Sequence, residues 1–213
     1  MDAIKTETYK GYEIRIHPDE NAEDPRSFES NLGTMACFHN RYNLGDKQDH
    51  KSDDFNGWAA LETHLRTEHG AVIVLPLFLY DHSGLRMKVG SFNGLLPQGH
   101  AEFDSGQVGF IYATKDAILE IGWGKKLTAA VLKKARESLE VEVTVYDQFL
   151  SGDVYGYRVV KPDKCEACGH DDDEEVDSCW GFYGMDETMA EAKRVVDALA
   201  PAKKKRGKRE AGK

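Results

Sequence analysis

Residues 71–89 read AVIVLPLFLYDHSGLRMKV, from Ala71 to Val89, and this stretch decides the fold class. The run from Ala71 to Tyr80 is apolar and predicts a buried strand, and the segment from Asp81 to Gly84 has the composition of a turn. Leu85 to Val89 predicts a shorter partner strand. Strands joined by so short a turn pair antiparallel, which favours a hairpin over a βαβ unit. The run also contains Pro76 and has about half of the roughly 20 residues that a membrane helix needs.

The rest of the chain mixes strand-like and helix-like patterns without a repeating βαβ period. Further strands are expected at Tyr9–His17, Leu32–Tyr42, Gln107–Ala113, Val154–Val160 and Ser178–Tyr183. Helices are expected from Ser52 to Gly70, after Thr114, after Thr128 and after Asp186. Alternating valines at 141, 143 and 145 predict a strand that forms a hairpin with Val154–Val160. The fold class is therefore α+β, with a mixed, mostly antiparallel sheet and about four helices.

Length and charge suggest one acidic domain with a basic end. The 213 residues suit a single α+β domain over residues 1–201, in which 161–177 forms an acidic, cysteine-containing loop. Residues 202–213 predict a disordered basic tail. Seven Lys and Arg against one Glu give this tail a net charge of +6, so the remaining residues carry −15 and the whole chain carries −9. Such a tail could contact nucleic acid. With no signal-peptide pattern at the N-terminus, we expect a cytoplasmic protein that does not bind membranes.

One pair of cysteines has the spacing of a metal-binding turn. Cys165 and Cys168 are separated by two residues, and His170 and Cys179 could add ligands to the same ion. A structural zinc site needs four ligands, and one CxxC pair supplies two. The alternatives are a structural Zn²⁺ site and free thiols in an exposed loop.

Acidic residues recur at the expected strand ends. They are Asp81, Asp104, Asp153 and Asp177, with His82 as a neighbouring nitrogen donor. Carboxylates that converge at one edge of a sheet can hold Mg²⁺ or Mn²⁺ for the hydrolysis of phosphodiesters or nucleotides. The alternative is that each Asp binds the backbone of its own turn.

Aromatic residues next to glycine predict a surface for partners. Tyr155 and Tyr157 flank Gly156 and should share one face of their strand, with Trp180 and Tyr183 nearby in the sequence. If that face is exposed, its rings could form the centre of a protein interface. If it is buried, the same rings belong to the core.

Several of these segments together resemble a family of small uncharacterised proteins encoded by bacteriophages and related mobile elements. The segments are NLGTM at 31–35, YDHSG at 80–84, DSGQVGFIY at 104–112 and DSCWGF at 177–182. The resemblance implies a bacterial host cytoplasm during infection and an accessory role, and it implies no catalytic residues.

Three functions are compatible with these patterns. The first is a non-catalytic binding or inhibitory module that acts on a host or phage protein or on a nucleic-acid-processing enzyme. The second is the divalent-metal-dependent hydrolase, and the third is a zinc-stabilised interaction module. No phosphate-binding loop, dinucleotide fingerprint, nucleophile elbow or zinc-protease helix occurs in the sequence.

Overall fold

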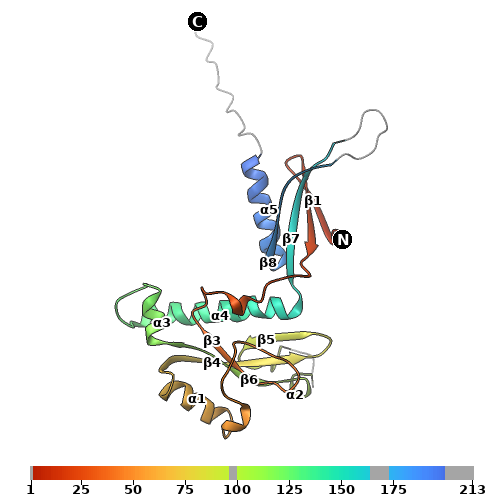
Figure 1. Ribbon diagram of the computed structural model, residues 1–213. Helices are drawn as coiled ribbons and strands as arrows, with labels where there is room; N and C mark the ends of the chain where they lie inside the picture. Colours follow the sequence, from red (N-terminus) through yellow and green to blue (C-terminus); the bar gives the residue numbers. More distant parts are fainter. Residues whose placement is uncertain (1, 96–99, 164–172, 200–213) are drawn as a thin grey trace. The chain divides into compact units, whose positions relative to one another are not determined.

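A computed structural model describes residues 2–95, 100–163 and 173–199 (Figure 1). Contacts divide the chain into two compact units. The central unit comprises residues 21–153, and the terminal unit comprises residues 1–20 together with 154–213. Each unit has its own sheet and core, whereas the chain length favoured one domain. The single domain expected over residues 1–201 stays a prediction.

The central unit contains a four-stranded antiparallel sheet. Its order is β3 (Thr34–Cys37), β6 (Ser105–Thr114), β4 (Ala71–Asp81) and β5 (Leu85–Val89). β4 and β5 are the expected hairpin, joined by a turn in which Ser83 has a φ of 59°. The α+β class with antiparallel pairing is confirmed.

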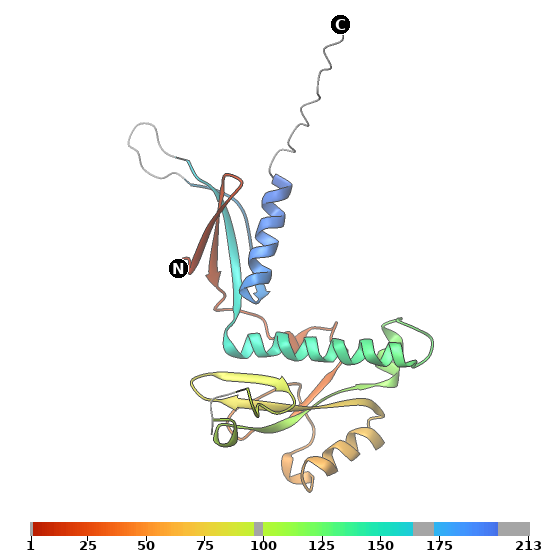
Figure 2. The same ribbon diagram turned by 180° about the vertical axis from the view of Figure 1, so that it is seen from behind.

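Helices cover both faces of this sheet. α4 (Ala129–Ser151) lies along one face and α1 (Trp58–Thr67) along the other, as Figure 2 shows from behind. α4 buries Leu139 and Val143, and α1 buries Leu61 and Leu65. The shorter elements of the unit are η1 (Pro25–Ser27), η2 (Ser52–Asp54), α2 (His100–Phe103) and α3 (Lys115–Glu120).

Two predicted helix starts are confirmed and one is wrong. The Thr114 hydroxyl accepts a hydrogen bond from Ala117 N–H at 3.2 Å, and Thr128 accepts one from Val131 N–H at 3.3 Å. Ser52 begins the 3₁₀ turn η2, whereas α1 begins only at Trp58. Gly57, with a φ of 82°, separates these two elements because its backbone turns the chain between them.

The strand predicted at residues 141–146 is also wrong, because these residues belong to α4. Val143 and Tyr146 continue the buried stripe of Leu139 at helical spacing, whereas Val141 is 61% exposed. The helix ends at Gly152, which has a φ of 71° and donates its N–H to Phe149 O. In residues 141–146 the apolar positions fit both a strand alternation and a helical stripe. The N-cap at Thr128 starts a helix that continues through them.

The terminal unit is a second antiparallel sheet covered on one face by a helix. Its order is β1 (Lys5–Tyr9), β2 (Tyr12–Pro18), β7 (Val154–Lys161) and β8 (Glu174–Tyr183), with α5 (Met185–Leu199) packed against it. Ile14 and Ile16 are fully buried against α5, as the alternation of their segment predicted. β8 begins at Glu174, so the last part of the expected acidic loop is strand. None of the helices in the described ranges has the length and apolar character needed to cross a membrane.

At Gly109 of β6 the backbones of β3 and β6 approach closely, and a substitution there tests how much space is left. A Cβ atom at this position would lie 2.0 Å from the Ala36 carbonyl oxygen of β3, and backbone cannot yield as a side chain can. We expect Gly109→Ala to lower the free energy of unfolding by about 3 kcal/mol, measured by urea denaturation. Gly106→Ala in the same strand is the matched control, since a Cβ there meets nothing within 4 Å. Equal stability of the two variants would contradict this prediction.

Candidate metal centre

The predicted acidic site comes together only in part. Asp81 ends β4, and its N–H donates a hydrogen bond of 2.9 Å to the carbonyl oxygen of Asp104. His82 Nδ1 lies 3.1 Å from an Asp104 carboxylate oxygen, and the Asp81 carboxylate forms an ion pair with Arg41. Asp81 and Asp104 also line a cavity of about 340 Å³. The structure therefore brings Asp81, His82 and Asp104 to one end of the β4–β5 hairpin.

The remaining two acids lie in other places. Asp153 follows α4, where its backbone N–H donates to Gln148 O at 2.8 Å. Asp177 belongs to β8 of the terminal unit and accepts a 2.9 Å hydrogen bond from the Tyr157 hydroxyl. Burial, then this hydrogen bond, raises the pKa of Tyr157. The Tyr157 hydroxyl is therefore a structural partner of the Asp177 carboxylate.

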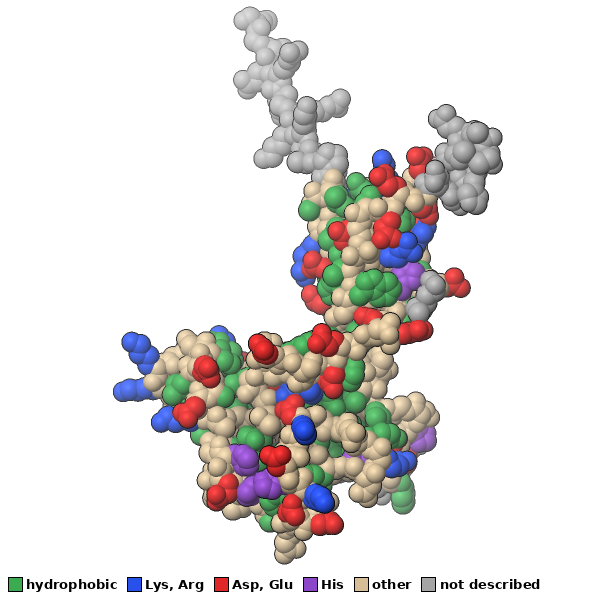
Figure 3. All heavy atoms as spheres, in the orientation of Figure 1, with side chains coloured by type: hydrophobic (Ala, Val, Ile, Leu, Met, Phe, Trp, Pro, Cys, Tyr) green, Lys and Arg blue, Asp and Glu red, His purple; other side chains and the backbone are tan. Residues whose placement is uncertain are grey.

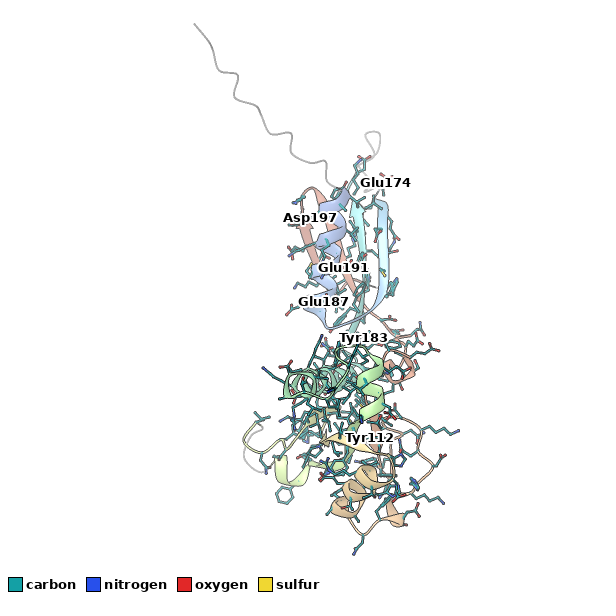
Figure 4. The ribbon with its side chains drawn as sticks, turned by 90° about the vertical axis from the view of Figure 1, so that its left-hand side faces the viewer. Tyr112, Glu174, Tyr183, Glu187, Glu191 and Asp197 are labelled. Atoms are coloured by element: carbon teal, nitrogen blue, oxygen red, sulfur yellow. The ribbon has the colours of Figure 1, made fainter. Side chains whose placement is uncertain are left out.

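Three acidic side chains on α5 are also paired. Figure 4 labels Glu187, Glu191 and Asp197 along this helix. Arg194 forms ion pairs with Glu187 and Glu191, and Lys10 reaches Asp197 at 2.6 Å. These acids therefore form a surface of ion pairs.

The expected aromatic surface is corrected by the structure. Tyr157 is 3% exposed and belongs to the core beneath α5, and Tyr155 packs against the same core. Tyr183 is half-buried at the end of β8, and Trp180 is 47% exposed. The strand face shared by Tyr155 and Tyr157 therefore points toward α5, because their rings fill the space between sheet and helix.

Among the four aromatic residues predicted for the surface, Trp180 keeps an exposed ring next to a glycine. A Cβ atom on Gly156 would lie 2.3 Å from the indole ring, so the ring covers bare backbone. His17 lies beside it with a ring-centroid distance of 6.0 Å.

The predicted cysteine site falls largely outside the described residues. Cys165, Cys168 and His170 are in the range 164–172, and the basic tail of 202–213 is also outside. Cys179 is exposed on β8. Zinc binding by these residues stays a prediction.

Three histidines of the central unit form a cluster that was not predicted. His50 lies in the loop before η2, His64 in the last turn of α1, and His69 between α1 and β4. Their ligand nitrogens all lie within 4.8 Å of one another. Within the described ranges, no other group of three or more His, Cys, Asp or Glu side chains converges in this way. Figure 3 shows histidine side chains gathered on the surface of this unit.

Two of the three distances between the imidazole rings match the spacing of ligands around one zinc ion. Ring centroids lie 4.9 Å apart for His50 and His64, 5.2 Å for His64 and His69, and 6.3 Å for His50 and His69. Tetrahedral zinc at the usual Zn–N distance of about 2.0–2.1 Å would space the centroids by roughly 5 Å. The ring planes are inclined by 70° to 89° to one another.

The surroundings of the cluster also favour an ion. The Nε2 atom of His64 is buried and has no hydrogen-bond partner within the described structure. A buried polar atom without a partner is costly, and a metal bond would satisfy it. Phe55 packs at 5.1 Å from the His64 ring, and Tyr112 of β6, labelled in Figure 4, lies 5.9 Å from the His69 ring. These ring contacts position two of the three imidazoles.

The sequence carries a weak signal for this site. Three of the eight histidines fall between residues 50 and 69, in a segment expected to contain one helix. His64 and His69 are five residues apart, which is not the spacing of the zinc-protease helix. His69 follows the end of α1 at Thr67, and its ring centroid lies 5.2 Å from that of His64.

Comparison with known proteins finds no relative from which a function could be inferred. The chain matches no protein-family model, no curated protein and no solved structure. The bacteriophage context stays an implication of the sequence resemblance.

Proposed function

We propose that the protein binds one divalent transition-metal ion, preferentially Zn²⁺, through His50, His64 and His69. Two observations carry this proposal: the ligand nitrogens of the three imidazoles lie within 4.8 Å of one another, and the buried Nε2 atom of His64 has no hydrogen-bond partner in the described structure. Imidazole suits zinc, copper, nickel and iron, whereas Mg²⁺ and Mn²⁺ prefer oxygen ligands. The ligands therefore differ from both the carboxylates and the cysteines that the sequence suggested.

Three protein ligands leave one coordination position open. Structural zinc sites are closed by four ligands, whereas catalytic sites keep a position for water or substrate. A zinc ion bound in this way polarises an oxygen ligand and lowers the pKa of bound water. The site is thus suited to hydrolysis or hydration, and the ion would also tie the loop of His50 to α1.

Titration of the full chain with Co²⁺ tests the proposal. We expect one equivalent to bind and to give the visible absorption of tetrahedral cobalt, and Zn²⁺ to displace it. The Cys165→Ser/Cys168→Ser variant is the control for the second candidate site, and it should keep the same stoichiometry and spectrum. Absence of binding, or its loss in the cysteine variant, would refute the histidine site.

A second candidate function is the non-catalytic binding module. Trp180 favours it, because an indole ring that is 47% exposed on a rigid strand can serve as an interface anchor. In affinity capture from bacterial lysate, Trp180→Ala should lose any specific protein partner. Val141→Ala, which removes an apolar side chain that is 61% exposed on α4, should retain it. Retention by both variants would exclude Trp180 as the anchor.

A further inference from the structure

Two cavities adjoin the histidine cluster and have Phe38 as a common wall. One has a volume of about 480 Å³ and is lined by polar groups that include Asn43, Lys47 and His50. The other has a volume of about 160 Å³ and is almost entirely apolar, with Phe55, Trp58 and Leu61 among its walls. His50 belongs to the first cavity, and Phe55 of the second packs against the rings of both His50 and His64.

The polar cavity favours an anion. Asp46 lines it, but its carboxylate is neutralised by Arg26 at 2.8 Å and accepts the N–H of Met35 at 2.7 Å. Burial, aided by Asp46, raises the pKa of Cys37 to about 12, so this thiol remains neutral. The exposed ammonium group of Lys47 has no ion-pair or hydrogen-bond partner among the residues that the structure describes. Lys47 therefore supplies an uncompensated positive charge beside His50.

The apolar pocket favours a ring or a branched chain. Phe38 and Phe55 lie 6.3 Å apart with their rings inclined by 51°, and Trp58 and Leu61 of α1 add further apolar surface. Only a small group fits a volume of about 160 Å³. Such a group would lose its hydration on entering, which adds affinity without a specific hydrogen bond.

We infer that the ligand of this site is a small organic anion with an apolar body, such as an aromatic or branched-chain carboxylate. Its carboxylate lies near Lys47 and takes the open position of the ion, and its apolar body enters the pocket of Phe38, Phe55 and Trp58. This assignment rests on the proposed metal function, which supplies the coordination position. The same arrangement disfavours inorganic anions, since these leave the apolar pocket empty.

Competition between benzoate and acetate at the Co²⁺-loaded full chain tests this inference. Both anions should alter the visible cobalt spectrum, and benzoate should bind at least about tenfold more tightly because its ring is buried. Trp58→Ala should remove most of the difference between the two anions. Lys47→Gln should weaken both, whereas Lys133→Gln, which removes an exposed charge on α4, should weaken neither.

The outcomes distinguish a failure of the ligand assignment from a failure of the metal site. If one equivalent of Co²⁺ binds but benzoate and acetate bind equally, the ligand assignment is overturned and the metal site stands. If Co²⁺ does not bind, the metal function fails, and an NMR titration of the metal-free chain with benzoate decides about the cavities. Shifts of Trp58 that depend on Lys47 would then support an anion site, and their absence would overturn it.

Discussion

Arg26→Met is expected to lower the free energy of unfolding by about 3–5 kcal/mol, the usual cost of leaving buried charges without their partner. The Arg26 side chain is 4% exposed and binds two carboxylates. It donates two hydrogen bonds to Asp46, at 2.9 and 2.8 Å, and one to Glu142 at 2.9 Å. Methionine fills a similar volume but leaves both acids uncompensated. Chemical denaturation followed by circular dichroism measures the effect.

The network around Arg26 explains why so large an effect is expected. Glu142 of α4 accepts the N–H groups of Leu32 and Gly33, and Arg26 also donates to the Gly33 carbonyl oxygen at 2.7 Å. Burial tends to lower the pKa of the Arg26 guanidinium, and the contacts with Asp46 and Glu142 outweigh it, so the pKa is raised. The guanidinium therefore fastens the segment before β3 to α4.

An exposed ion pair provides the control for Arg26. Arg66 of α1 pairs with Glu62 at 2.8 Å, and both side chains are more than 40% exposed. Arg66→Met should cost no more than about 1 kcal/mol, because solvent screens the pair. The double variant Arg26→Met/Glu142→Gln should recover part of the loss, since one buried charge is removed. A cost below about 1 kcal/mol for Arg26→Met itself would show that the network is unimportant for stability.

The local part of the fold was predictable from the sequence. The hairpin of residues 71–89 needs only an apolar run and a turn, and the starts of α3 and α4 need only the hydroxyls of Thr114 and Thr128. The error at residues 141–146 arose because Val143 fits both a strand alternation and the buried stripe of α4. Tertiary packing decides between the strand period and the helix period, and a segment of six residues does not contain that information.

The candidate site was not predictable for a related reason. His50, His64 and His69 come from a loop, a helix end and a turn, so no single period connects them. Conversely, Asp81 and Asp177 were singled out together because both stand at strand ends, yet they belong to different compact units. A sequence shows which residue types could bind an ion, whereas their convergence depends on how segments fold over one another.

His64→Ala is expected to weaken binding of Zn²⁺ or Co²⁺ by at least about 100-fold, since even changes behind the ligands cost about 10- to 100-fold. His64 is the ligand whose loss is most informative, because its buried Nε2 has no other partner in the described structure. The substitution therefore breaks no hydrogen bond of that atom in the metal-free protein. Isothermal titration calorimetry with the full chain measures the affinity.

Stability in the presence of zinc gives an independent measurement of the same site. At a zinc concentration 100-fold above Kd, the ion should stabilise the native protein by about 2.7 kcal/mol. A variant with about 100-fold weaker affinity would gain only about 0.4 kcal/mol at that concentration. His82→Ala, which removes an imidazole paired with Asp104 outside the cluster, should gain as much as the natural chain. Equal stabilisation of the His64→Ala variant would place the ion elsewhere, because zinc stabilises only through the site that it occupies.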